Sequence, residues 1–171
     1  AIFTEIDNVE IDLLSISFSN FTDNFGDSND KQMMIQSSNN KFIFENNRVE
    51  YTQVKTAGAM ELTLNTSAEL TYSTFINCKV SDYQTINILP YSTFTPSFTM
   101  NNCDFNDCIT NSYIIHLQNK GDDTISDCSF IFSNNENACA GIDIDSPDQV
   151  TIENCKFENN KNNNQGETGC L

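Results

Sequence analysis

The side chains best suited to acid–base catalysis are scarce in this sequence. His116 is the single His and Arg48 the single Arg among 171 residues. His116 alternates with Ile115 and Leu117, so it should point outward from a strand, beside the outward Asp143. Proton abstraction next to a sugar carboxylate needs a base close to a cation that neutralises the carboxylate. Because Arg48 lies in a distant turn segment, we expect a solvated Arg48, an exposed His116–Asp143 pair and no enzymatic activity.

Acidic residues dominate the rest of the polar surface. The formal net charge is −16 at pH 7, which repels phosphate backbones and anionic headgroups, so we expect no nucleic-acid partner. No run approaches the ~20 apolar residues of a membrane span, so we expect no membrane insertion. Carboxylates bind Ca2+, but no loop has the ligand spacing of an EF-hand, and we expect no cofactor beyond weak surface Ca2+. The acidic clusters are Asp143, Asp145 and Asp148, and Asp27 and Asp30.

The elements that position these side chains repeat along the chain. One pattern occurs in segments 13–18, 44–49, 70–75, 100–105, 125–130 and 152–157. It consists of an apolar residue, two mostly polar residues, Cys or a substitute, a polar residue and then Phe or Val. Its last position recurs every 25 to 31 residues, at Phe18, Val49, Phe75, Phe105, Phe130 and Phe157. Such recurrence is the signature of a solenoid, and we expect these six side chains to form one inward stack.

A second segment in most repeats alternates apolar and polar residues. It covers 60–64, 86–88, 115–117 and 141–145, and period-2 alternation in short runs indicates strands with one buried face. Strands that recur once per coil must pair in parallel, each coil rising by roughly 4.8 Å. The sequence therefore predicts an all-β, single-stranded parallel β-helix of about six coils, each of 25–32 residues, that forms one domain over residues 1–171.

Two segments carry a resemblance to a known superfamily. Residues 150–160, Val-Thr-Ile-Glu-Asn-Cys-Lys-Phe-Glu-Asn-Asn, and the preceding Gly141-Ile-Asp-Ile-Asp145 resemble the right-handed parallel β-helix repeats of the pectate-lyase-like superfamily. Phe157-Glu-Asn-Asn160 is also similar to the Phe-x-x-Asn repeats of chlamydial polymorphic membrane proteins, although the paired-Gly motif of that family is absent. The resemblance implies a right-handed coil. It also implies an asparagine ladder at a bend, at Asn46, Asn102, Asp127 and Asn154, interrupted by Ser15 and Tyr72.

Many members of this superfamily cleave polysaccharides, and one motif here resembles theirs. Gly121-Asp-Asp123 is similar to the Gly-Asp-Asp of polygalacturonases, but their Gly-His-Gly and Arg-Ile-Lys motifs are missing from this chain. The departures from the family pattern agree with the expectation of no enzymatic activity.

The seven Cys residues divide by their phase in the repeat. Cys139 and Cys170 lie 31 residues apart, and Cys78 and Cys108 lie 30 apart, each about one coil. We expect a disulfide between Cys139 and Cys170, with Cys78 to Cys108 the next pair. The alternative is that in-register Cys residues stay as buried thiols, acting as small apolar side chains. Such a stack is expected for Cys103, Cys128 and Cys155.

Two N-glycosylation sequons, Asn20-Phe-Thr22 and Asn65-Thr-Ser67, occur in the sequence. Together with the paired Cys phases they predict an extracellular or cell-surface location. The chain has no initiator Met and no signal peptide, so we read it as a processed chain or a segment of a longer one.

The leading functional hypothesis is a structural module of an extracellular fibre or surface protein that stacks head to tail into a continuous β-helix. From Phe157 across a junction to Phe18 of the next copy is 32 residues, close to one coil. The expected assembly edges are Ala1, Ile2, Phe3, Cys170 and Leu171. The first alternative is a carbohydrate-binding or adhesive module, which needs aromatic residues exposed on one face, whereas Tyr83, Tyr91 and Tyr113 are scattered. The second is a polysaccharide lyase or hydrolase, which needs a groove with converging acids and a base.

Overall fold

Short strands make up almost all of the regular structure. The computed structural model describes residues 2–6, 13–22, 25–26, 33–37, 41–50, 53–54, 59–64, 66–80, 84–90, 95–110, 112–118, 120–131, 134–135, 141–145 and 148–162. These residues form 24 strands and no helix. Accordingly, no helix in this part of the chain is long and apolar enough to cross a membrane.

The strands belong to four sheets of six. Sheet A contains β1 (Ile2–Ile6), β5 (Met33–Ser37), β9 (Met60–Leu64), β13 (Ile86–Pro90), β17 (Ile115–Leu117) and β21 (Ile142–Ile144). Sheet B contains β2 (Leu13–Ser17), β6 (Lys41–Glu45), β10 (Ala68–Thr71), β14 (Phe98–Asn101), β18 (Asp122–Ser126) and β22 (Gln149–Glu153). Sheet C contains β3 (Asn20–Thr22), β7 (Arg48–Glu50), β11 (Thr74–Ile76), β15 (Asp104–Asn106), β19 (Ser129–Ile131) and β23 (Lys156–Glu158). Sheet D contains β4 (Phe25–Gly26), β8 (Gln53–Val54), β12 (Lys79–Val80), β16 (Ile109–Thr110), β20 (Asn134–Asn135) and β24 (Lys161–Asn162).

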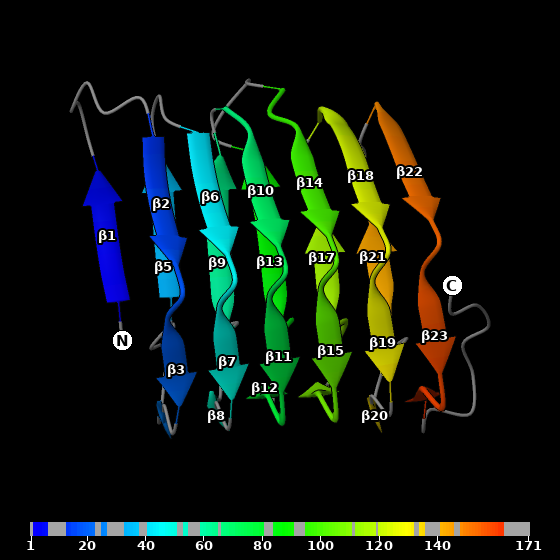
Figure 1. The fold of residues 1–171 in the computed structure, drawn as a ribbon. Helices are drawn as coiled ribbons and strands as arrows, with labels where there is room; N and C mark the ends of the chain where they lie inside the picture. The colour runs from blue at the N-terminus through cyan, green and yellow to red at the C-terminus, as the bar shows by residue number, and fades with distance from the viewer. Residues whose placement is uncertain are drawn as a thin grey trace.

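The chain passes six times through sheets A, B, C and D in that order, returning to sheet A after each of the first five passes. Each strand pairs in parallel with the strand one coil away in the same sheet, as for β9 with β13 and β11 with β15. In Figure 1 the coils advance from left to right, sheets B and C run downward on the near side, and sheet A runs upward behind them. This is the right-handed sense that crossovers between parallel strands adopt. The predicted right-handed parallel β-helix is confirmed.

The core is a set of in-register columns inside the coil. In sheet C, Phe75 pairs with Phe105, and Phe105 with Phe130. Their rings stack with centroids 4.8 and 5.0 Å apart and planes within 4° of parallel. Phe130 stacks in the same way on Phe157, at 4.8 Å. A constant ring position in these four successive coils lets one side-chain type fill the interior closely.

The first member of this column is Phe21, because Phe21 pairs with Val49. The predicted member Phe18 is wrong: its side chain is 81% exposed. In the first coil the repeat lies three residues later than the sequence pattern suggested, since Ile16 pairs with Phe44 of the next coil. Phe18 therefore falls at the bend between sheets B and C, and Ser15 lies inside β2.

Both bends at the ends of sheet C need left-handed backbone. Asn46, Asn102, Asp127 and Asn154 have φ of 52° to 53° at the first bend, and Asn77, Asp107 and Asn159 have φ of 52° to 57° at the second. Asn and Asp enter this region more cheaply than other side chains with a Cβ, which explains their abundance here.

Main-chain hydrogen bonds connect neighbouring coils through the first bend. The N–H of Asn46 donates to Thr71 O at 3.0 Å, and that of Asn102 donates to Ser126 O at 3.2 Å. The side chains of Asn102, Asp127 and Asn154 are exposed. The expected ladder of stacked amides is thus replaced by a main-chain ladder, with the polar side chains pointing outward.

Gly121 fits the short turn between β17 and β18 against the coil before it. A Cβ at this position would lie 2.0 Å from Pro96 O and 2.5 Å from Pro96 C. Because the obstructing atoms are main chain, no side chain larger than a hydrogen fits without moving the backbone. Gly121 is therefore explained by packing, which also sets where the adjacent Asp122 and Asp123 begin β18.

Candidate functional site

The two carboxylates of the Gly-Asp-Asp motif do not converge. Asp122 is exposed, whereas Asp123 is 1% exposed and points into the coil, because neighbours in a strand face opposite sides of the sheet. Asp123 Oδ1 accepts a hydrogen bond from the N–H of Phe98 at 3.0 Å. A pair of carboxylates that work as acid and base must share one cavity. The motif therefore has the sequence of a catalytic pair without its geometry.

His116 and Asp143 meet on the outer face of sheet A. They pair in register between β17 and β21, and His116 Nδ1 lies 2.7 Å from Asp143 Oδ2. Tyr113 stacks on the His116 ring with centroids 6.4 Å apart. The two side chains are 16% and 30% exposed, so the pair is partly covered where an exposed pair was expected. This contact between neighbouring coils holds His116 in place.

The expected Ca2+ ligands nearby are held by polar partners. The amide Nε2 of Gln118 donates to Asp145 Oδ2 at 3.3 Å, while Asp143 contacts His116 and Asp148 is exposed. Among the residues that the structure describes, no group of three or more His, Cys, Asp or Glu is arranged to hold a metal ion. Asp27 and Asp30 lie outside those residues.

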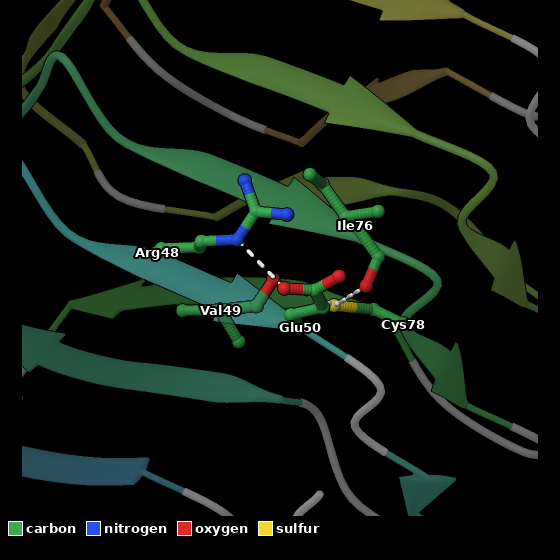
Figure 2. A network of polar contacts seen from close by, with 5 residues as sticks. All are labelled: Arg48, Val49, Glu50, Ile76 and Cys78. Atoms are coloured by element: carbon green, nitrogen blue, oxygen red, sulfur yellow. Dashed lines mark hydrogen bonds and ion pairs between the residues drawn. The ribbon is translucent and has the colours of Figure 1, made fainter. Parts of the chain in front are cut away.

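Arg48 belongs to β7 and not to a turn. Its Nε lies 2.7 Å from Glu50 Oε2 on the outer face of sheet C, and Figure 2 shows the two side chains together. Beneath them the Cys78 sulfur lies between the carbonyl oxygens of Val49 and Ile76, at 3.9 and 3.8 Å. In this pair the Arg48 side chain is exposed and the Glu50 side chain is largely covered.

Other Cys residues make contacts like that of Cys78. Cys108 Sγ lies 3.5 Å from Phe75 O, and Cys103 Sγ lies 3.5 Å from both Leu70 O and Asn101 O. Each thiol thus faces main-chain carbonyls at a bend, one in its own coil and one in the coil before. A thiol is a weak donor, and here it adds a side-chain contact to main-chain carbonyl oxygens at the bend.

Cys78 and Cys108 are free thiols, so the predicted disulfide between them is not formed. Their sulfurs point at carbonyls along the bend and not at each other. Cys103 and Cys128 are buried and Cys155 is half-buried, all three as free thiols. The other predicted pair, Cys139 and Cys170, lies outside the described residues.

At the first bend, the position that Cys103 occupies in its coil holds Asn47 or Ser73 in the earlier coils. Asn47 Nδ2 donates to Ile16 O at 2.7 Å, and its Oδ1 accepts the Ser19 N–H at 2.9 Å. In the next coil Ser73 Oγ donates to Thr71 O at 2.9 Å and accepts the Asn47 N–H at 3.2 Å. Small side chains that donate to the bend carbonyls are therefore what this position requires, whichever of Cys, Ser or Asn supplies the donor.

The thiols of Cys128 and Cys155, at the first bend, are poor nucleophiles. The side-chain hydrogen bond with Cys103, and then burial, raise the pKa of Cys128 far above its ordinary value. Burial raises the pKa of Cys155 as well. Because the thiolate is the reactive form, these side chains stay protonated and unreactive near neutral pH.

Two aromatic side chains stand out on the outside of the first bend. Phe18 is 81% exposed and Tyr72 is 56% exposed, and they are the exposed large hydrophobic residues among those whose burial the structure describes. Their φ angles are 52° and 49°, in the left-handed region. We call this line of left-handed residues the bend ridge; its six members, one per coil, are Phe18, Asn46, Tyr72, Asn102, Asp127 and Asn154.

Hydrogen bonds order the polar half of the bend ridge. Asn101 Nδ2 donates to Ser126 Oγ at 2.6 Å and lies 3.4 Å from Asp127 Oδ2. Asn102 Nδ2 also donates to Asn101 Oδ1. Amide and carboxylate groups are thereby held at a fixed spacing next to the aromatic half.

Sequence reasoning missed the aromatic half of the ridge. The repeat pattern places Phe18 in the core and makes Tyr72 an interruption of the asparagine ladder. The available signal was the spacing from the bend: Ile16, Phe18 and Phe21 repeat the spacing of Phe44, Asn46 and Val49. That alignment places Phe18 where other coils carry Asn or Asp.

The remaining predicted sites fall partly within the structure. Asn20 is exposed on β3, as a glycan acceptor must be. Ile2 and Phe3 lie on β1 at one edge of sheet A. Outside the described residues are Asn65, Ala1, Cys170, Leu171, Tyr83 and Tyr91.

Neither the known protein families nor the curated proteins contain a significant match to this chain.

Proposed function

We propose that this chain is a rigid, non-catalytic structural module of an extracellular or cell-surface protein. The observation that carries the proposal is the unbroken register of all four sheets over six coils. Phe stacking inside and main-chain hydrogen bonds at the bends tie each coil to the next. In a solenoid each coil contacts only its neighbours, so such a module extends along one axis and holds outer side chains at constant spacing.

The polar residues with catalytic potential support a structural role. Asp122 and Asp123 face opposite sides of β18, and His116 is occupied by Asp143 and Tyr113. We expect no lyase or hydrolase activity on polygalacturonate or on neutral polysaccharides, measured as release of reducing ends and of unsaturated products. Turnover that disappears in the variant Asp122→Asn, Asp123→Asn would overturn the proposal in favour of the enzyme hypothesis.

Head-to-tail stacking of copies extends the proposal. Among the described strands, β1 to β4 pair on one side only, as do β21 to β24. Pairing such edges between copies satisfies their main-chain groups, and because the contact is heterologous it extends into a filament. Each copy then adds an axial rise of about 29 Å, six coils at roughly 4.8 Å. Electron microscopy that shows only isolated particles, together with a monomer by analytical ultracentrifugation, would contradict stacking.

An extracellular or surface location is part of the same proposal. The exposed Asn20 precedes the half-buried Phe21 and the exposed Thr22, so the acceptor side chain of the sequon is accessible on sheet C. We expect peptide mapping of the native protein to find an N-linked glycan at Asn20 or at Asn65. Recovery of both peptides unmodified from the native source would remove this support.

A further inference from the structure

We propose that the bend ridge binds the surface of an extended, neutral, β-1,4-linked polysaccharide, with Phe18 and Tyr72 as the two stacking side chains. The inference rests on the rigid register of the proposed structural module, because that register sets the spacing of the ridge. It adds a ligand class and a binding surface to that function.

Backbone conformation is the first observation that supports the proposal. In four of the six coils the left-handed ridge position holds Asn or Asp, namely Asn46, Asn102, Asp127 and Asn154. An aromatic residue is a poor choice for this backbone. Side chains kept at strained backbone positions occur preferentially at binding sites. Phe18 and Tyr72 are therefore not explained by the stability of the bend.

Exposure is the second observation. A single exposed aromatic residue on a protein surface needs no explanation. Here the two exposed large hydrophobic residues among those whose burial the structure describes, Phe18 and Tyr72, lie on one line along the solenoid. Main-chain hydrogen bonds hold the three bends in register, since Phe18 N–H donates to Glu45 O and Asn46 N–H donates to Thr71 O.

Spacing identifies the ligand. Phe18 and Tyr72 are two coils apart, about 9.6 Å along the axis. In an extended β-1,4-linked chain each sugar is turned over relative to the last, so the same ring face returns after two sugars, over a similar length. The C–H face of every second sugar then meets the electron-rich face of an aromatic ring.

The polar residues of the ridge complete the surface. Asn46 lies between the two rings, and Asn102, Asp127 and Asn154 continue the line with amide and carboxylate groups. Amides both donate and accept hydrogen bonds, which suits sugar hydroxyls. The formal charge of −16 disfavours uronates and sulfated glycans. The ligand class that fits is therefore a neutral polysaccharide.

The test is binding of the purified chain to microcrystalline cellulose and to chitin, with polygalacturonate as the acidic comparison. The variants are Phe18→Asn, Tyr72→Asn and the double variant, in which each aromatic residue is replaced by the residue found elsewhere on the ridge. We expect the wild-type chain to bind cellulose or chitin but not polygalacturonate. Affinity should fall by about tenfold or more in the double variant.

The same substitutions should raise thermal stability, because Asn fits the left-handed backbone. We expect the Tm of each single variant to rise by about 2–4 °C. The matched control is Asn77→Asp at the second bend, which should leave binding and Tm unchanged. Reduced binding in a variant with a raised Tm cannot result from unfolding.

Three results would overturn the inference. They are failure of the wild-type chain to bind either polysaccharide, equal binding by the double variant, and a loss of self-association in the double variant that accounts for the reduced binding. In all three cases a native far-UV circular dichroism spectrum and Tm would leave the structural module standing. Failure of the module itself is recognised separately, by loss of that spectrum in the wild-type chain.

Discussion

Asp123 accepts the main-chain N–H of Phe98 through its carboxylate Oδ1, at 3.0 Å, inside the apolar coil. In the neighbouring coils the same position of sheet B holds Phe42, Ala68 and Phe98, all buried. The carboxylate provides a side-chain acceptor for a main-chain donor at the beginning of β14, inside the coil. Asp123 is thus a structural residue in a motif that looks catalytic.

Asp123→Ala should therefore destabilise the fold, since it removes this buried hydrogen bond to the Phe98 N–H. The expected cost is about 1–3 kcal/mol, measured by urea unfolding. Asp123→Asn keeps an acceptor oxygen and should cost less, while Asp122→Asn, at an exposed position, should change stability by less than about 0.5 kcal/mol. Equal effects of the Asp122 and Asp123 substitutions would contradict the assigned geometry.

The Phe column of sheet C should dominate the stability of the middle coils. Phe105 is fully buried between Phe75 and Phe130, so Phe105→Ala should cost about 3–5 kcal/mol. Phe18→Ala is the matched control, because Phe18 is 81% exposed, and it should not destabilise. A large loss of stability in the Phe18 variant would restore the original assignment of Phe18 to the core.

Asn47 should be needed for its side-chain hydrogen bonds to the first coil. Asn47→Ala leaves both the Ser19 N–H and the Ile16 carbonyl without their partner, at a cost of about 1–3 kcal/mol. Asn47→Ser should recover part of the loss, because Ser73 supplies the donor at the equivalent position of the next coil. Unfolding free energies of the two variants that agree within error would argue against this role.

Stability should decline at alkaline pH because of the buried thiols. The contact with Cys103 and burial raise the pKa of Cys128 in the folded chain, whereas the unfolded thiol ionises near about 8.5. Above that pH the unfolded state releases a proton that the folded state keeps, so the free energy of unfolding falls as pH rises. The decline from Cys128 is up to about 1.4 kcal/mol per pH unit.

Urea unfolding between pH 7 and pH 10 tests this expectation. Cys128→Ser keeps a small donor at the bend, as Ser73 does, but removes the ionisable group. Its free energy of unfolding should decline less steeply above pH 8.5 than that of the wild-type chain. Parallel curves for the two proteins would show that the thiol does not titrate on unfolding.

The fold was predictable because the repeat fixes both strand period and coil length. Alternation at Met60, Leu62, Ile86 and Ile88 reappears as in-register pairs between β9 and β13. The first coil was misassigned because Phe18 and Phe21 both match an apolar core position, and only the bend distinguishes them. Hydrophobic pattern alone does not encode which residue adopts φ near 50°.

The side-chain chemistry was harder to predict than the fold. In-register spacing brings Cys78 and Cys108 to adjacent coils, but it does not specify where the sulfur points, and both face main-chain carbonyls. Likewise, Gly121-Asp-Asp123 has the sequence of a catalytic motif, yet strand alternation places its two carboxylates on opposite faces of the sheet. The bend ridge depends on aligning the first and third coils through their backbone conformation, which composition does not reveal.

The most direct test of the structure is a measurement of the strand register that places Phe18, Asn46 and Tyr72 on one line. Through-hydrogen-bond NMR couplings between an amide nitrogen and a carbonyl carbon identify donor and acceptor residues individually. We predict couplings from Phe18 N to Glu45 C′, from Asn46 N to Thr71 C′ and from Tyr72 N to Asn101 C′, across hydrogen bonds of 3.2, 3.0 and 3.1 Å. Couplings from these amides to carbonyls within their own coil, or to carbonyls displaced by three residues, would contradict both the solenoid register and the ridge.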